Sequence, residues 1–132
     1  MWGKCILDPA WLVEKLARCG MGAGVGDTID VAGQVAMDPG GKIVGTGDMT
    51  AQSRQVFDNI EAILALAGAS MADVVKITTY LTDMGGYADF SVVRAEVFPD
   101  AKIASATVAS PVLVNPACLV EVETIAVIGA GG

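Results

Sequence analysis

The residue best suited to proton transfer in this chain is Glu121, which lies between Val120 and Val122 in an alternating stretch near the C-terminus. A carboxylate on a strand with apolar neighbours is partly removed from water, which raises its pKa toward the range useful for acid–base chemistry. Alternatively, Glu121 and Glu123 simply face solvent at the edge of a sheet. The pattern therefore offers one acid–base or water-positioning candidate beside a purely structural interpretation.

The remaining reactive side chains narrow the range of possible reactions. The 132 residues include no histidine, which excludes Ser-His-Asp catalysis, Cys-His catalysis and every metal site with a histidine ligand. Cys5, Cys19 and Cys118 are odd in number and widely spaced, which argues against a disulfide framework and a structural zinc site. No histidine is available to stabilise the thiolate of Cys19, so an unreactive small residue is the favoured interpretation over a nucleophile. Cys118 is interpreted as a buried residue that packs in the core. We expect no metal and no cofactor.

Glycines supply further candidates for ligand contact. Gly33 has no Cβ, so its backbone N–H could approach a ligand oxygen, although a β-bulge or tight strand packing accounts for it equally well. The glycine-rich stretch 20–26 has the composition of a phosphate-binding loop, but such a loop joins a strand to a helix. Here it leads into a predicted strand over 27–33, which favours a turn and a glycine-rich strand.

Composition limits the partners of the chain. Hydrophobic residues make up 53% of it, charged residues 17%, and the formal net charge is −7. The eight Lys and Arg residues are scattered singly, which argues against nucleic-acid binding. No apolar run has the length of a membrane span and no secretory signal is evident, so we expect a cytoplasmic protein. Surplus apolar surface predicts self-association.

The longest predicted helix carries the clearest periodicity. Val56, Ile60 and Ile63 recur at spacings of three and four, which is the pattern of one buried helix face. Thr50 can cap its start and Gly68 can end it. The polar residues assigned to its solvent face are Gln52, Arg54, Asp58 and Glu61.

Three further strands and a second helix follow. They are predicted as a strand over 74–81, a helix over 87–98, and strands over 104–109 and 119–128. In the first of these strands, alternation places Val75 on the same side as Ile77. The resulting order, β-β-α-β-α-β-β, predicts an α/β (α+β) domain with two helices on one face of a mixed sheet. A short helix over 9–18 precedes it, and a flexible tail over 129–132 follows.

Several ordered motifs make the chain resemble the Rid (reactive intermediate deaminase) family. They include Val31-Ala32-Gly33-Gln34-Val35, Asp73-Val74-Val75-Lys76, Tyr80-Leu81-Thr82-Asp83-Met84 and Val120-Glu121-Val122-Glu123-Thr124-Ile125-Ala126. The resemblance defines residues 26–128 as a Rid-like domain after a divergent N-terminal segment, 1–25. It implies a chorismate-mutase-like fold, a homotrimer around a central barrel, and a small-molecule cleft between subunits. It also implies hydrolysis of enamines or imines to a carbonyl product and ammonia.

The resemblance assigns site residues as well. Gly33 and Glu121 are retained, and the glutamate is implied to contact a water in the cleft. The resemblance implies an arginine that binds the substrate carboxylate just before the strand that contains Ser105 and Thr107. It also implies that Ser105 and Thr107 lie beside the ligand. Residues 102–107 contain no arginine, so this chain resembles a divergent member.

Two other family positions also depart from the pattern. A tyrosine that lines the cleft corresponds to Cys19, and an asparagine corresponds to Arg94. We hypothesise that Arg94 supplies the missing cation from its helix, although a solvated helix arginine is the simpler interpretation. Without a cation, an anionic substrate about 4 Å from ionised Glu121 would be repelled by about 4 kcal/mol at an effective dielectric of about 20.

Three functions stay open on this basis. The first is an enamine or imine deaminase with an altered substrate. The second is a non-catalytic protein that binds a small metabolite in the same cleft. The third is an endoribonuclease or translation inhibitor, as some relatives have been named, which the net charge of −7 disfavours.

Overall fold

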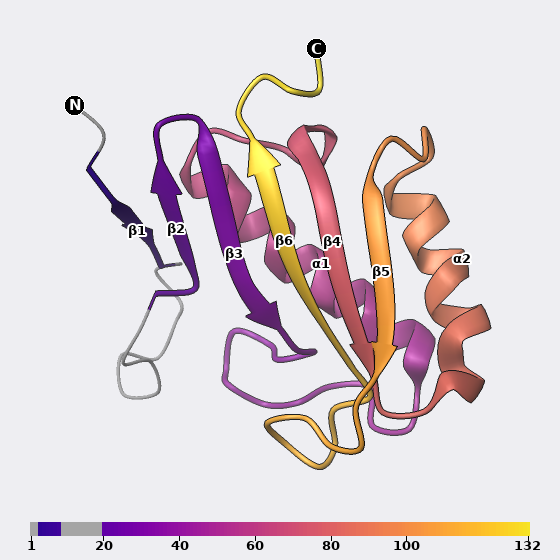
Figure 1. The fold of residues 1–132 in the computed structure, drawn as a ribbon. Helices are drawn as coiled ribbons and strands as arrows, with labels where there is room; N and C mark the ends of the chain where they lie inside the picture. The colour runs from indigo at the N-terminus through magenta and orange to yellow at the C-terminus, as the bar shows by residue number, and fades with distance from the viewer. Residues whose placement is uncertain (1–2, 9–19) are drawn as a thin grey trace.

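A six-stranded sheet and two α-helices form the fold in the computed structural model, which describes residues 3–8 and 20–132 (Figure 1). The elements in chain order are β1 (Cys5–Leu7), β2 (Gly22–Val25), β3 (Thr28–Gln34), α1 (Met49–Leu66), the 3-10 turn η1 (Met71–Asp73), β4 (Val74–Leu81), the 3-10 turn η2 (Met84–Gly86), α2 (Tyr87–Val97), β5 (Ala104–Ala109) and β6 (Val120–Val127). The predicted order of strands and helices is confirmed, with β1 added in front of it. The predicted helix over 9–18 lies outside the described residues.

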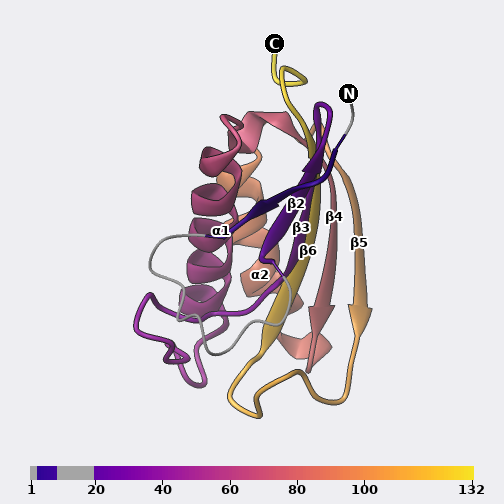
Figure 2. The same cartoon turned by 90° about the vertical axis from the view of Figure 1, so that its left-hand side faces the viewer.

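The sheet is mixed, as expected, and its order is β1-β2-β3-β6-β4-β5. Every neighbouring pair is antiparallel except β4 and β5, which are parallel. Both helices lie against one face, and no described element covers the other, which we call the open face (Figure 2). This arrangement confirms the fold class: the helices following β3 and β4 both return across the same side of the sheet.

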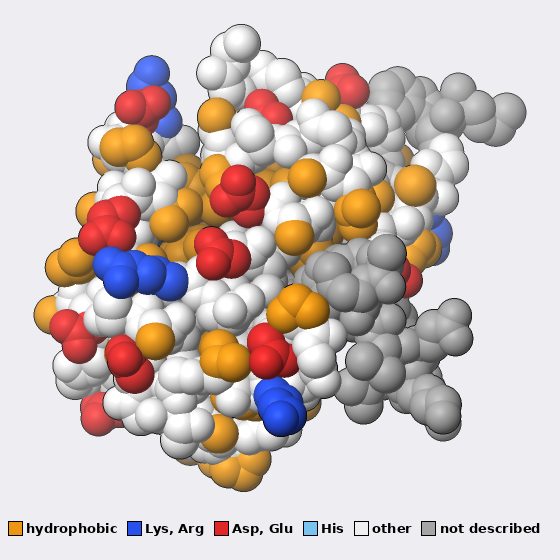
Figure 3. Space-filling model, turned by 180° about the vertical axis from the view of Figure 1, so that it is seen from behind, with side chains coloured by type: hydrophobic (Ala, Val, Ile, Leu, Met, Phe, Trp, Pro, Cys, Tyr) orange, Lys and Arg blue, Asp and Glu red, His pale blue; other side chains and the backbone are white. Residues whose placement is uncertain are grey.

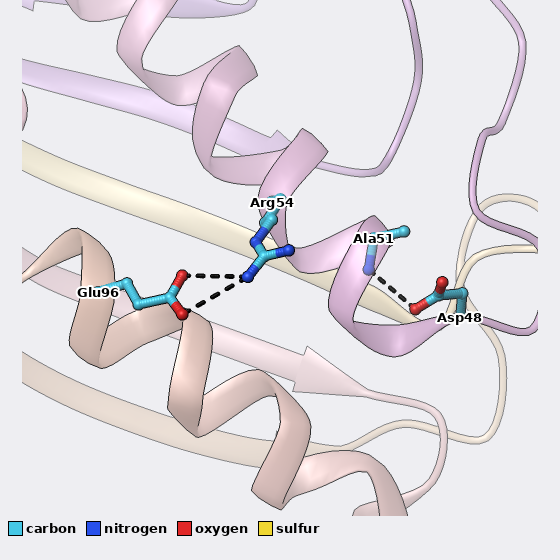
Figure 4. A network of polar contacts seen from close by, with 4 residues as sticks. All are labelled: Asp48, Ala51, Arg54 and Glu96. Carbon is cyan, nitrogen blue, oxygen red and sulfur yellow. Dashed lines mark hydrogen bonds and ion pairs between the residues drawn. The ribbon is translucent and has the colours of Figure 1, made fainter.

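Helix α1 forms the centre of the core. Val56, Ile60 and Ile63 are fully buried, and each such side chain contributes about 1.5–3 kcal/mol to folding. The predicted cap was wrong: the Asp48 carboxylate, not Thr50, accepts a hydrogen bond from the Ala51 N–H at 3.0 Å (Figure 4). The carboxylate reaches the third residue of the helix, whereas Thr50 already lies inside it.

The end of α1 and its polar face give one confirmation and one correction. Gly68 has a φ of +76° just after the helix, the left-handed conformation that ends helices. Gln52 was predicted on the solvent face, but its side chain is fully buried. Helical spacing alone cannot reveal this, because a loop far along the chain covers the first turns of α1.

The two helices contact each other through aromatic rings and one surface ion pair. Phe57 of α1 stacks on Phe90 with ring centroids 6.0 Å apart and meets Phe98 edge-on at 5.7 Å. The Arg54 guanidinium of α1 lies 3.3 Å from the Glu96 carboxylate of α2 (Figure 4). Both charged side chains are more than half exposed, so the pair contributes at most about 1 kcal/mol. The rings hold the helices together.

Strand β4 departs from simple alternation at its start. Val75 is 38% exposed whereas Ile77 is fully buried, so their predicted placement on one side was wrong. The pairing of β4 with β6 shifts between Val74 and Lys76, and such a bulge turns one residue out of the alternating pattern. From Ile77 onward the alternation is regular.

Three further sequence predictions concern the glycine-rich stretch, the C-terminal tail and membrane-spanning segments. The glycine-rich stretch forms β2 and the turn into β3, which confirms the turn and strand predicted there. The tail, predicted as flexible, donates a hydrogen bond from the Gly131 N–H to the Asp73 carboxylate at 3.0 Å. In the residues described, no helix has both the length and the apolar character that crossing a bilayer requires.

Candidate functional site

Glu121 stands on β6 with its side chain on the open face. It pairs with Tyr80 of β4. The next pair along the two strands, Leu81 and Val120, has side chains that are fully buried beneath the helices, so the side chains of Tyr80 and Glu121 point to the opposite face. Glu121 is half-buried. Burial, and secondarily the charge of Glu123, raise the pKa of the Glu121 carboxyl above its ordinary value, which is the direction expected of an acid–base group.

Gly33 makes room for this carboxylate. A Cβ at Gly33 would stand 2.6 Å from Oε2 of Glu121, closer than any side chain tolerates. The pairing of β3 with β6 shifts between Val31 and Gln34, so Gly33 lies at an irregular point of the sheet. Of the interpretations left open, the irregular register supports the β-bulge, and the approach of the Gly33 N–H to a ligand oxygen stays a prediction.

Tyr80 and Glu123 complete what we call the Glu121 corner, defined by Gly33, Tyr80, Glu121 and Glu123. The Tyr80 hydroxyl donates to the Glu123 carboxylate at 2.7 Å, and this bond is the main cause that raises the pKa of Tyr80. Within the described residues, the Glu121 carboxylate has no hydrogen-bond partner, so it is available to a water or a ligand.

The nearby thiol offers no nucleophile. Cys118 is buried, and burial raises the pKa of its thiol, with a smaller contribution from the charge of Glu121. A thiol in such surroundings stays protonated and inert. Cys19 lies outside the described residues. Among those described, no group of three or more carboxylates and thiols is arranged to hold a metal ion.

A second cluster, the Arg94 corner, lies at the edge of the helix layer. Arg94 of α2 donates to the Tyr87 hydroxyl at 3.0 Å, to Oγ of Ser105 on β5 at 3.2 Å and to Oγ of Ser91 at 3.4 Å. Its guanidinium carbon lies 5.5 Å from the ring centroids of both Tyr87 and Phe90. These four polar residues, Tyr87, Ser91, Arg94 and Ser105, define the corner.

The Arg94 guanidinium is oriented but not neutralised. In the part of the chain that the structure describes, no carboxylate lies within ion-pair distance of it. Its neighbours are hydroxyls and ring faces, which orient a cation and leave its charge available to an anion. A cavity of about 300 Å³ adjoins it, lined by the polar residues Ser91, Arg94 and Ser105 and by apolar residues that include Phe98 and Ile103.

The two corners face opposite sides of the sheet. Ser105 pairs with Ile77, whose side chain is fully buried under the helices. Ser105 and, two residues on, Thr107 therefore point to the helix side, whereas Glu121 points to the open side. One chain thus brings Arg94 to Ser105 and Glu121 to Gly33, but it does not bring the two pairs together. Thr107 shares the side of Ser105 without a hydrogen bond to Arg94.

Sequence reasoning missed the hydroxyls around Arg94 and the partner of Glu123. Ser91 and Tyr87 precede Arg94 by three and seven residues, and this helical spacing was a signal that could have found them. Tyr80 could not be found in this way, because its place beside Glu121 and Glu123 depends on the register of two strands far apart in sequence.

Comparison with known proteins places this geometry in a family. The sequence model of the family described as endoribonuclease L-PSP matches residues 17–128. A RutC family protein of Pyrococcus horikoshii is 42% identical over 101 residues, which cover 76% of this chain and 79% of that protein.

Solved structures agree with the sequence match. The crystal structure of yeast Mmf1 superposes with a TM-score of 0.88 at 28% identity, covering 96% of this chain and 99% of that one. A Yersinia pestis member of the conserved Rid protein family gives a TM-score of 0.88 at 26% identity, covering 96% and 100%. The chain therefore belongs to the Rid family, whose sequence model carries the description endoribonuclease L-PSP.

Proposed function

We propose that this protein hydrolyses an imine or enamine that carries a carboxylate, releasing ammonia and a carbonyl product. The observation that carries the proposal is the Arg94 guanidinium, held 3.2 Å from Oγ of Ser105 at the start of β5. The resemblance calls for a carboxylate-binding arginine just before this strand, and the strand itself has none. Arg94 supports the same chemistry from the helix, with Ser105 and Thr107 as the strand residues beside the ligand.

We further propose that the reactive cleft is shared between copies of the chain in a homotrimer. Arg94 and Glu121 face opposite sides of one sheet, so a single chain cannot place both on one small molecule. Strand β5 pairs with β4 alone among the described strands, and five of its six residues are exposed. A second copy seated along this edge would cover it and bring its own Glu121 corner.

In this cleft Glu121 would activate the attacking water. The carboxylate takes a proton from the water as the water oxygen bonds to the imine carbon, and the C=N electron pair moves to nitrogen. The proton then passes to that nitrogen, which gives a carbinolamine. Glu121 next takes the hydroxyl proton of the carbinolamine and passes it to the nitrogen, so that the carbonyl C=O forms as the C–N bond breaks and ammonia leaves. A raised pKa suits a group that must both accept and return a proton near neutral pH. Arg94 meanwhile pairs with the substrate carboxylate and offsets its repulsion from Glu121.

A second candidate is a metabolite-binding protein without catalysis. The separation of the two corners within one chain favours it, because a cavity of about 300 Å³ with one cation can bind a small carboxylate without Glu121. Endoribonuclease activity has less support: acidic and basic side chains are dispersed over the described part of the helix side, without a broad basic area (Figure 3). We propose a cytoplasmic location, as expected from the sequence.

The experiment is an ammonia-release assay with imines generated in place by an amino-acid oxidase. Imines from small neutral, large apolar and acidic amino acids are compared, with and without the protein. We expect faster ammonia release for at least one class, and none from a Glu121→Ala, Arg94→Ala double variant. No acceleration for any class, together with binding of the corresponding keto acids, would instead establish the metabolite-binding alternative.

A further inference from the structure

The side-chain amide of Gln52 joins α1 to the segment that leads into β6. Its Nε2 donates to the Ala117 carbonyl at 2.8 Å, and its Oε1 accepts from the Leu119 N–H at 2.8 Å. The side chain is fully buried. The two bonds bracket Cys118, which is 1% exposed, so one amide holds a three-residue segment of backbone against the helix.

Asn59 makes the matching connection to the segment that follows β3. Its Nδ2 donates to the carbonyls of Val35 at 3.2 Å and Met37 at 2.9 Å, and its Oδ1 accepts from Gln55 at 2.8 Å. It is 5% exposed. Asn59 follows Gln52 by seven residues, about two helical turns, so both amides project from one face of α1.

Both held segments end at the same point of the sheet. Leu119 lies two residues before Glu121, and Val35 lies two residues after Gly33. The Glu121 carboxylate occupies the space over Gly33. We propose that Gln52 and Asn59 are positioning residues, whose buried amides fix the two strands so that the Glu121 carboxylate stays half-buried over Gly33.

The physical reason is that the held backbone groups have no substitute partner in the interior. An apolar replacement at Gln52 would leave the Ala117 carbonyl and the Leu119 N–H unpaired and buried, and the segment would move outward to reach water. That movement exposes Cys118 and the start of β6. Among the described residues, the titratable groups around Glu121 are Glu123, Tyr80 and Cys118. None of them is altered, so a change in the titration of Glu121 would report on its position.

The test replaces Gln52 by methionine, which has nearly the same length and no hydrogen-bonding amide. Carboxyl-detected NMR follows the titration of Glu121, and a thiol reagent follows Cys118 in a background with Cys5→Ser and Cys19→Ser. We expect the pKa of Glu121 to fall toward its ordinary value and the reaction of Cys118 to become about tenfold faster. In the ammonia-release assay kcat should fall with little change in KM, because the Arg94 corner is untouched.

The matched control is Ile63→Val, which trims a buried side chain near the other end of α1. Ile63 contacts the region of Gly22 on β2, away from Glu121, so the same measurements should stay at wild-type values. If Gln52→Met does not fold, Gln52→Asn serves, since its shorter amide adds no charge, cannot keep both bonds and should give a smaller change in the same direction.

An unchanged titration of Glu121 and an unchanged rate at Cys118 in a folded Gln52 variant would overturn the inference. The inference rests on the proposed function only for the catalytic meaning of Glu121. Absence of ammonia release by the wild-type protein would therefore remove the proposed function and leave the titration test intact, so the two failures are distinguishable.

Discussion

The Glu121 corner and the Arg94 corner differ in how the fold supports them. Glu121 stands on the interior strand β6, in a space left by Gly33 and between segments held by buried amides. Arg94 stands on a surface helix beside the edge strand β5, held by hydroxyls and ring faces. The first arrangement depends on the core and tolerates little change, whereas the second can be rebuilt by single substitutions at the surface. If the proposed function holds, this difference accounts for an acid–base group that is kept while the cation moves from strand to helix.

The largest effect should follow removal of the acid–base group. Glu121→Ala should lower kcat for ammonia release by about 100-fold or more, the usual contribution of a positioned acid or base. Glu61→Gln, which removes an exposed carboxylate of α1, is the control and should retain most of the activity. In the wild type the acid limb of the kcat/KM profile should lie above the ordinary glutamate pKa of 4.5. Equal turnover by Glu121→Ala and the wild type would remove this corner from the mechanism.

The next effect should come from the cation. Arg94→Ala should lower kcat/KM by about tenfold to a hundredfold, mainly through KM, because the lost interaction binds the carboxylate before and during reaction alike. Arg54→Ala is the control, since it removes a surface arginine of the other helix whose ion pair contributes little. If both variants showed the same small loss, Arg94 would be an ordinary solvated arginine.

A smaller effect should follow from filling the space over Gly33. Gly33→Ala would place a Cβ 2.6 Å from the Glu121 carboxylate, so the carboxylate or β3 must shift. Because the atoms that must move belong to the end of a flexible side chain, we expect a loss of at most about 1 kcal/mol in the free energy of unfolding, measured with urea, together with a lower kcat as the carboxylate is displaced. The control is Gly40→Ala, in the exposed turn before α1, which should leave the free energy of unfolding and kcat close to their wild-type values. A wild-type kcat in Gly33→Ala would contradict the close approach of the Glu121 carboxylate to Gly33.

The smallest effects concern the pH dependence of stability, where Asp73 and Glu121 should differ because their pKa values are shifted in opposite directions. The pKa of Asp73 is lowered by hydrogen bonds from the Gly131 and Ser70 N–H groups, so its contribution is present above its ordinary pKa of 3.8 and is lost as the pH falls through the lower folded value. Glu121 behaves oppositely: its raised pKa means that folding loses stability as the pH rises through the interval above 4.5.

Urea unfolding from acid to neutral pH checks this contrast. Asp73→Asn should cost about 1 kcal/mol near neutral pH and nothing in strong acid. Glu121→Gln should be more stable than the wild type near neutral pH, with a gain that disappears in acid. The same pH dependence for both variants would contradict the different surroundings of the two carboxylates.

The alternation and helical spacing of the sequence predicted most of the fold. In each corner they singled out two of the four residues: Gly33 and Glu121 in one, Arg94 and Ser105 in the other. The alternation of β6 placed Glu121 opposite the buried valines, and helical spacing placed Arg94 on α2. What could not be predicted depends on contacts between distant segments. Gln52 is polar in a helix and was therefore placed in solvent, yet its amide meets a loop 65 residues later. Val75 left the alternating pattern because of a bulge whose cause lies in the register with β6.

The central claim, that two copies complete one cleft, is tested most directly by mixing two variants that each have low kcat/KM, assayed at a substrate concentration well below the wild-type KM. Glu121→Ala and Arg94→Ala chains are unfolded together in equal amounts and refolded, and ammonia release is measured against each variant refolded alone. Clefts that take Glu121 from one copy and Arg94 from its neighbour should restore about one quarter of wild-type activity by random assembly. No recovery in the mixed sample, with oligomers of wild-type size present, would contradict a cleft shared between copies.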